Sequence, residues 1–344
     1  MQQKALNLLF VATVVTVGIA VASSFSRPGS IGTGARGNAV FGGLAEKANS
    51  LTAVMIDAGD WQAELKRQGE QFVDASGYPV KLEPIRSMIT GLATLTYEEA
   101  KTADPTRYSE LELADPGPEV GAGRLVKLLN GETVVASLIV GERDLTVGGM
   151  RGGIFARLPD DPQSWLLRGA VDLPTGRGEL FESQLLGLNT NQVARVTVAD
   201  NASGESLVLV SGAAGEPLTA SDSSLPVDPA KVLALSALVN NLQFADVRPA
   251  TADAAIVGSV TYQTRDGMII AVDRLAVQDA DIAAEVFGWL RLNVSAGDQA
   301  SDKTREQVAA LKARTDGYEF SLFQTAFDTL SGGPAGLLKK PEQG

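Results

Sequence analysis

The sequence of 344 residues contains no cysteine and no histidine. Without cysteine the chain has no disulfide, no thiolate nucleophile and no sulfur-ligated metal. Without histidine it lacks the commonest general base and the commonest transition-metal ligand, which excludes Ser–His–Asp and Cys–His centres and H-E-x-x-H zinc sites. Ser–Lys chemistry, carboxylate pairs and oxygen-ligated Ca²⁺ or Mg²⁺ sites remain compatible with the composition.

Basic side chains are also scarce relative to acidic ones. The chain has 29 Lys and Arg against 41 Asp and Glu, a formal net charge of −12. Nucleic-acid binding needs a basic face, and docking on anionic lipid needs a polybasic patch. We therefore expect neither partner and interpret the acidity as serving solubility.

Residues 32–37 read Gly-Thr-Gly-Ala-Arg-Gly, a literal G-x-G-x-x-G. This fingerprint binds a dinucleotide only between a strand and a helix, whose N-terminus receives the pyrophosphate. Here an apolar run precedes the glycines, and no helix start follows them. We expect an accidental match and no cofactor.

The apolar run covers residues 5–22, with Lys4 before it and no charge within it. About 18–20 apolar residues in a helix span the hydrocarbon core of a bilayer. We expect residues 1–26 to form an uncleaved signal-anchor, with a cytoplasmic N-terminus and the rest outside the membrane, in the periplasm of a Gram-negative cell. Cleavage after Ala22 is the alternative. Residues 27–40, rich in Gly and Ser, are expected to form a flexible tether.

The rest of the chain is predicted to be α+β and to consist of two tandem repeats, residues 41–188 and 189–331. Each has two alternating strands, a proline-marked helix, a strand leaving the helix and a hairpin. The common order is β-β-α-β-β-β, a twisted antiparallel sheet with a helix packed on one face.

A constant offset of 147 residues supports the duplication. It relates five pairs of positions, namely Pro79 and Pro226, Val80 and Val227, Leu92 and Val239, Leu95 and Leu242, and Tyr97 and Phe244. The hairpins turn at Asn130-Gly131 and at Asp266-Gly267, dipeptides that favour two-residue turns.

Two segments lie outside this pattern. Residues 295–317 of the second repeat form an insert, with a helix capped by Ser301 or Asp302. This helix is expected to cover a sheet edge, and binding of a partner is the alternative. Residues 332–344, rich in Gly and Pro, are predicted to be a disordered tail.

Several residues invite a functional interpretation, and none forms a catalytic set. Trp61, Trp165 and Trp289 are interpreted as packing residues rather than sugar platforms. The carboxylates of segments 160–165 and 279–285 lack the spacing of a calcium loop. The glycines and arginines of segment 141–153 are read as a hairpin tip rather than an anion site. Ser301-Asp302-Lys303 lacks the Ser-x-x-Lys spacing. We assign no catalytic, cofactor-binding or metal residue and expect no enzyme.

A set of short motifs runs along the chain from residue 41 to residue 330. They are Phe41-Gly42-Gly43-Leu44 before Asn49, Trp61, Tyr78-Pro79, Gly91-Leu92 with Leu95, Lys101-Thr102-Ala103, Arg107-Tyr108, Leu111, Ile139-Val140-Gly141, Gln163-Ser164-Trp165-Leu166, Gly317-Tyr318-Glu319-Phe320 and Asp328 with Leu330. Together they resemble the domain-of-unknown-function family 4340. A tryptophan that this family usually has shortly after residues 163–166 is replaced here by Phe181.

The resemblance implies a single-pass envelope protein, of a kind often encoded beside ABC transporter components of the gliding-motility type. The family has no agreed catalytic residues. We therefore expect a non-catalytic, membrane-anchored accessory subunit in the inner membrane, with the membrane, an ABC permease and other envelope subunits as partners. A periplasmic module that binds lipid or glycan without a transporter is the alternative.

Overall fold

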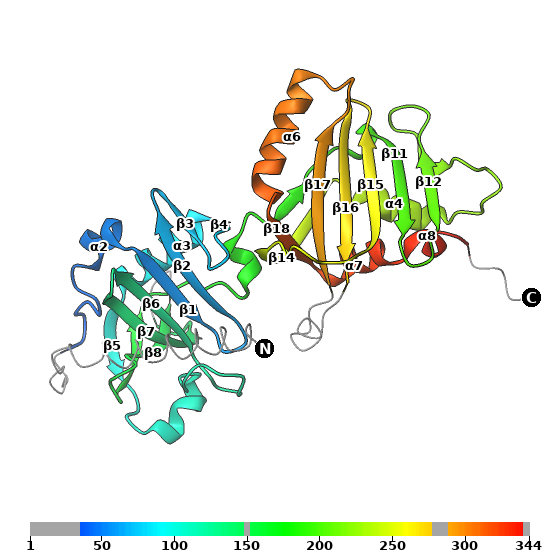
Figure 1. The fold of residues 1–344 in the computed structure, drawn as a ribbon. Coiled ribbons are helices and arrows are strands. Elements are labelled where there is room, and N and C mark those ends of the chain that lie inside the picture. The colour runs from blue at the N-terminus through cyan, green and yellow to red at the C-terminus, as the bar shows by residue number, and fades with distance from the viewer. Residues whose placement is uncertain (1–34, 148–151, 277–287, 340–344) are drawn as a thin grey trace, which may run out of the picture. The chain divides into compact units, whose positions relative to one another are not determined.

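A computed structural model describes residues 35–147, 152–276 and 288–339 (Figure 1). The chain divides into two compact units, one ending at Leu180 and the other beginning at Phe181. Each unit is built on its own antiparallel sheet, with helices packed against it. The mixed α+β class expected from the sequence is confirmed.

The sheet of the first unit has the strand order β4-β3-β2-β1-β6-β7-β8-β9-β5. Its strands are β1 (Ala53–Asp57), β2 (Gln62–Gln68), β3 (Gln71–Val73), β4 (Pro79–Val80), β5 (Thr96–Ala100), β6 (Arg124–Asn130), β7 (Thr133–Asp144), β8 (Gly153–Arg157) and β9 (Ser164–Arg168). Helix α2 (Leu44–Lys47) and the 3₁₀ turn η2 (Ala48–Ser50) precede them, and η4 (Arg177–Leu180) ends the unit.

One face of this sheet forms the main core. Leu65, Val54 and Leu128 are neighbours across β2, β1 and β6, and all three are buried. Helix α3 (Leu82–Thr94) buries an apolar stripe at the spacing of a helical face, Ile85, Met88, Ile89 and Leu92. The predicted helix and its apolar face are therefore present.

The sheet of the second unit has the order β10-β14-β18-β17-β16-β15-β11-β12-β13. Its strands are β10 (Gln184–Leu186), β11 (Val193–Asp200), β12 (Ser206–Val210), β13 (Thr219–Ala220), β14 (Leu242–Pro249), β15 (Ile256–Thr264), β16 (Met268–Leu275), β17 (Trp289–Ala296) and β18 (Tyr318–Leu322). The 3₁₀ turn η5 (Thr190–Gln192) precedes β11. The helices are α4 (Pro229–Ala237), α6 (Asp302–Thr315), α7 (Gln324–Ser331) and α8 (Gly333–Gly336).

The core of this unit joins α4 to the sheet. Val232 and Leu235 of α4 are buried, and the hydroxyl of the buried Tyr262 on β15 donates to the carbonyl of Leu235 over 2.9 Å. Asp228 caps the helix through the N–H of Ala230, and Pro229 occupies its first turn. This is the N-terminus expected from the proline pattern.

Seven strands of each sheet follow the same order when the second sheet is read from its β13 end. The run β2-β1-β6-β7-β8-β9-β5 corresponds to β12-β11-β15-β16-β17-β18-β14, with α3 and α4 at the same place in the chain. In chain order, the last strands of the two sheets are β9 and β18, and neither was predicted as part of the repeat. They pair with β5 and β14, which leave the helices.

The insert of the second unit contains the predicted helix. Ser301 caps α6 by accepting a hydrogen bond from the N–H of Thr304 over 3.1 Å. Strand β18 pairs with β17 only at Trp289 and Leu290, and α6 packs against β17 (Figure 1). The helix therefore covers a strand that its neighbour leaves partly unpaired.

The predicted membrane anchor, residues 1–26, lies outside the described residues. No helix within the described part of the chain is long and apolar enough to span a membrane. Of the predicted tether, residues 35–40 are described, and they are folded. Ala39 bridges Thr96, and the N–H groups of Gly37 and Val40 donate to carbonyls of Tyr97 and Leu95. The first unit therefore includes residues 35–40.

Two further boundaries differ from the prediction. The repeat boundary placed at residues 188 and 189 comes too late, because β10 already pairs with β14. The tail predicted as disordered from residue 332 is folded as far as Lys339. Pro334 opens α8, Leu337 is buried, and Leu338 bridges Val227. The apolar residues at the end of the tail outweigh its Gly and Pro content.

Candidate interaction site

The most elaborate surface feature of the first unit is the β5–β6 loop, residues 101–123. It contains the 3₁₀ helix η3 (Pro105–Leu111), capped by Asp104 through the N–H of Thr106. Tyr108 and Leu113 of this loop pack on Ile139, which alternates along β7 with the main-core residue Leu138. The loop thus forms a second, smaller core on the sheet face opposite the main core.

Glycines allow the backbone of this loop to pack closely against neighbouring segments. A Cβ atom at Gly141 would lie 2.2 Å from the carbonyl oxygen of Leu111, and one at Gly123 would lie 2.8 Å from that of Glu112. At Gly59 it would lie 2.3 Å from the oxygen of Gly117. Real Cβ atoms do not approach so closely, so only glycine lets the loop lie this near the strands.

Arg157 of β8 holds the loop from beneath. Its side chain is 5% exposed, and its Nε donates to the carbonyl of Leu113 over 2.8 Å. One guanidinium nitrogen pairs with Asp115, and the group lies 4.6 Å from the ring centroid of Tyr108. A buried cation is tolerable only when satisfied in this way.

The β8–β9 connection, residues 158–163, completes the arrangement. Ser164 exchanges hydrogen bonds with the backbone of Thr102, donating to its carbonyl over 2.7 Å and accepting from its N–H over 3.0 Å. The Tyr108 hydroxyl donates to the carbonyl of Pro162 over 2.6 Å. The two connections therefore fix each other.

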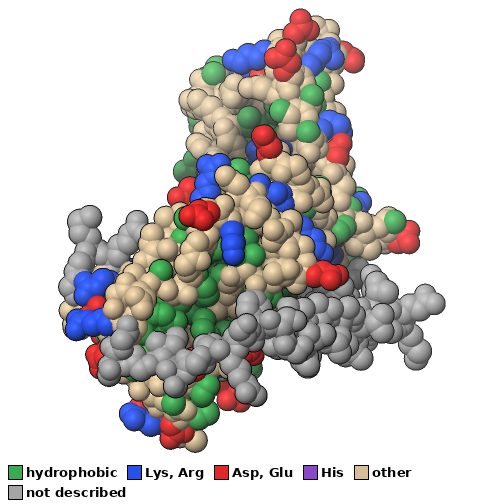
Figure 2. Space-filling model, turned by 90° about the vertical axis from the view of Figure 1, so that its left-hand side faces the viewer, with side chains coloured by type: hydrophobic (Ala, Val, Ile, Leu, Met, Phe, Trp, Pro, Cys, Tyr) green, Lys and Arg blue, Asp and Glu red, His purple; other side chains and the backbone are tan. Residues whose placement is uncertain are grey.

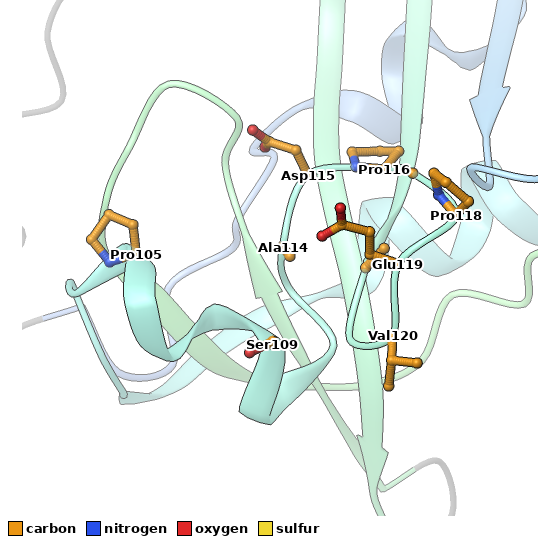
Figure 3. A pocket seen from close by; sticks show the side chains of 10 residues that line it. Pro105, Ser109, Ala114, Asp115, Pro116, Pro118, Glu119 and Val120 are labelled. Atoms are coloured by element: carbon orange, nitrogen blue, oxygen red, sulfur yellow. The ribbon is translucent and has the colours of Figure 1, made fainter.

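Two adjoining hollows open on this surface. One, of about 500 Å³, lies between η3 and residues 114–120, as Figure 3 shows, with Pro105 and Ser109 on the helix side. The other, of about 470 Å³, reaches Tyr108, Arg157 and the β8–β9 connection. They share Pro105, Ala114 and Asp115. We call the two together the proline hollow, since their walls include Pro105, Pro116, Pro118, Pro159 and Pro162.

The exposed charges of the proline hollow are acidic. The Asp115 side chain is 87% exposed, Glu119 and Asp160 are exposed, and Asp161 is half-buried. The cation that lines the hollow, Arg157, is buried and paired. Figure 2 shows acidic and basic side chains interspersed over the face that it views.

A second polar cluster lies on the sheet of the second unit. The Glu319 side chain is fully buried and accepts from Arg248 over 2.9 Å, Arg291 over 2.7 Å and the N–H of Thr251 over 2.8 Å. Burial alone raises the pKa of Glu319, but the Thr251 N–H and the two guanidinium groups outweigh burial and hold that pKa below its ordinary value.

Asp273 lies on β16, and its pKa shifts in the opposite direction. It accepts from the amide of Asn293 over 2.6 Å and is 8% exposed. Burial raises its pKa, and the hydrogen bond from Asn293 and the charge of Arg291 oppose this only in part. The cluster explains why two carboxylates are tolerated in this sheet, and it leaves them engaged in structural contacts.

The structure places the residues considered from the sequence as follows. Trp165 and Trp289 are buried, Trp165 edge-on to Tyr97 and Trp289 under the guanidinium of Arg248. Trp61 is half-buried, and its indole N–H donates to the carbonyl of Thr175. Ser301 is a helix cap. Within the described residues no three Asp or Glu lie together in a metal-binding group. Segment 279–285 and residues 148–151 lie outside them.

The comparisons with known proteins bear on this arrangement. The sequence model of a family described as a domain of unknown function (DUF4340) matches residues 71–257. The chain belongs to the DUF4340 family. No curated protein and no solved structure matches it significantly.

Motifs that carry the resemblance to DUF4340 meet around the proline hollow. Residues 101–103 and 107–111 belong to the β5–β6 loop, and residues 139–141 to the part of β7 on which this loop lies. Residues 163–166 form the end of the β8–β9 connection and the start of β9. The hollow itself was not predicted, because the glycines and prolines that form it read only as loop signals. The sequence feature that could have indicated the hollow is the repeated Pro and Gly in Asp115-Pro116-Gly117-Pro118.

Proposed function

We propose that this DUF4340 protein is a non-catalytic adaptor built from two tandem repeats of one fold. The matching strand orders of the two sheets support the duplication. The 147-residue offset also relates the starts of α3 and α4, Leu82 and Pro229. An adaptor needs rigid platforms that present surface to other proteins, and an antiparallel sheet carrying ordered loops supplies one.

The observation that carries the proposal is the construction of the proline hollow. Its walls are loops fixed on a sheet by glycines and by Arg157, and its solvent-facing groups are proline rings, carboxylates and Val120, which is 99% exposed. Apolar groups and charges on a rigid, exposed loop are the ingredients of a protein-binding surface.

The place of action is part of the proposal. The apolar run at residues 5–22 supports a membrane anchor, and the family resemblance supports an ABC-type transporter as the partner. The chain would then act on the periplasmic side of the inner membrane as an accessory subunit, in assembling the transporter or handling its cargo. Energy would come from an ATPase in another subunit.

Purification of the tagged, full-length protein in a gentle detergent tests this proposal. We expect an ABC permease and its ATPase to co-purify and to be identified by mass spectrometry, and deletion of residues 1–26 to abolish their recovery. Recovery of the protein alone, carrying lipid or glycan, would contradict the adaptor and favour a ligand-binding module.

A further inference from the structure

We propose that the proline hollow binds an extended segment of a partner protein that carries Lys or Arg beside an apolar residue. The inference rests on the adaptor function and names the surface and the partner's chemistry. It follows from three features of the hollow, which are its rigidity, its apolar walls and the sign of its exposed charge.

The hollow is preformed. The β5–β6 loop packs closely against Gly59 and Gly141, and Gly121 lets two parts of the loop approach each other closely, so its backbone has little room to shift. Arg157 donates a hydrogen bond to the loop, Ser164 ties the loop to β9, and Tyr108 ties it to the β8–β9 connection. Proline further restricts the backbone at positions 116 and 118. A segment that binds here therefore orders little of this chain, which lowers the entropic cost of association.

The walls offer apolar contact to a narrow ligand. Pro105 lies on the η3 side, and Pro116 and Pro118 lie on the facing loop (Figure 3). Val120 at the end of this loop is almost completely exposed. Volumes of about 500 and 470 Å³ suit the side chains of a few residues of an extended chain rather than a whole domain.

The charges select a cationic partner. Asp115 offsets the charge of the buried Arg157, and the exposed carboxylates of Glu119 and Asp160 leave the hollow with an acidic surface. Complementary charge raises the rate of encounter and penalises acidic competitors. Anionic ligands such as lipid headgroups, nucleic acid and acidic peptides are disfavoured by the same charges.

Site-specific photo-crosslinking tests the inference in the full-length protein. The photoreactive residue p-benzoylphenylalanine replaces Val120 in cells that make the native partners, and cross-linked peptides are sequenced by mass spectrometry. The matched control carries the same probe at Leu145, an exposed apolar position of this unit that does not line the hollow. We expect an adduct from Val120 whose partner peptide contains Lys or Arg, with no such adduct from Leu145.

Charge reversal then tests the electrostatic part. The double variant Glu119→Lys and Asp160→Lys should reduce the Val120 adduct about tenfold, since two favourable charge pairs become repulsive. The double variant Glu70→Lys and Glu132→Lys, in the β2–β3 and β6–β7 turns, carries the matched change away from the hollow and should leave the yield unchanged.

The outcomes separate this inference from the proposed function. Absence of a protein adduct at Val120 while the transporter still co-purifies overturns the inference and leaves the adaptor standing. An adduct to lipid, to an acidic peptide, or one insensitive to charge reversal also overturns it. A charge-sensitive adduct to a basic segment of a protein unrelated to transport supports the inference and contradicts the transporter assignment.

Discussion

Single residues determine whether the β5–β6 loop stays on its sheet, and Gly141 is the clearest case. Gly141→Ala should destabilise the first unit by about 2 kcal/mol or more, because the added methyl group must displace the Leu111 carbonyl. Gly176→Ala is the matched control, since nothing lies within 4 Å of its added carbon. It should change stability by less than about 0.5 kcal/mol.

Hydrogen exchange distinguishes the two glycine variants. We expect amides of residues 108–123 to exchange faster in Gly141→Ala and to keep their protection in Gly176→Ala. Equal protection in both variants would show that the loop does not depend on the close approach at Gly141.

The ionised Glu319 should stabilise the second unit only above the pH at which it becomes protonated. Its folded-state pKa is lowered, so its contribution is present above the unfolded value of about 4.3 and is lost as the pH falls through the folded value. Glu319→Gln should cost about 3 kcal/mol at neutral pH, because Arg248 and Arg291 lose their counter-charge.

Deuterium pulse labelling after equilibration in urea measures this cost for peptides of the second unit. The difference between wild type and Glu319→Gln should shrink as the equilibration pH falls below about 4.3. A difference independent of pH would contradict the assignment of the ionised form.

Asp273 gives a prediction of opposite sign. Its folded-state pKa is raised, so its unfavourable contribution is absent below the unfolded value of about 3.9 and grows as the pH rises toward the folded value. Asp273→Asn keeps an acceptor for Asn293 and should stabilise the second unit by about 1 kcal/mol at neutral pH. Loss of stability in the same urea experiment would refute this interpretation.

Among the elements, the segment of residues 35–40 protects the edge of β5. Val40→Pro removes the N–H that donates to Leu95 and should expose this edge, at a cost of about 1–2 kcal/mol. Ala39→Pro is the control, because Ala39 occupies a bridge position whose own N–H does not bond to β5. Faster amide exchange at Tyr97 in Val40→Pro alone is the expected result, and equal exchange in both variants would argue against the edge role.

Elements that depend on local sequence could be predicted, whereas elements that depend on distant contacts could not. The hairpins β6–β7 and β15–β16 and the helices α3 and α4 depend on local geometry and were predicted. The two-residue turns predicted at Asn130-Gly131 and Asp266-Gly267 were wrong in position, because Asn130 pairs with Thr133 around Gly131 and Glu132, and the three residues 265–267 separate β15 from β16. The pairing of β9 with β5, the close packing of the β5–β6 loop and the docking of residues 332–339 depend on contacts between distant residues. Local patterns do not contain that information.

Over the whole chain, the two sheets share the order of seven strands but differ in their surface additions. The first carries the proline hollow, and the second carries α6 beside β17 and the cluster around Glu319. Under the proposed duplication, the common fold supplies stability and the additions distinguish the repeats. Partner binding is therefore assigned to a feature of the first repeat alone.

Native mass spectrometry of the full-length protein, released from a gentle detergent, tests the adaptor account most directly. The account predicts assemblies whose masses equal this chain plus a permease and an ATPase, and their loss when residues 1–26 are deleted. A single species with the mass of this chain plus one lipid or glycan, and no protein partner, would contradict it.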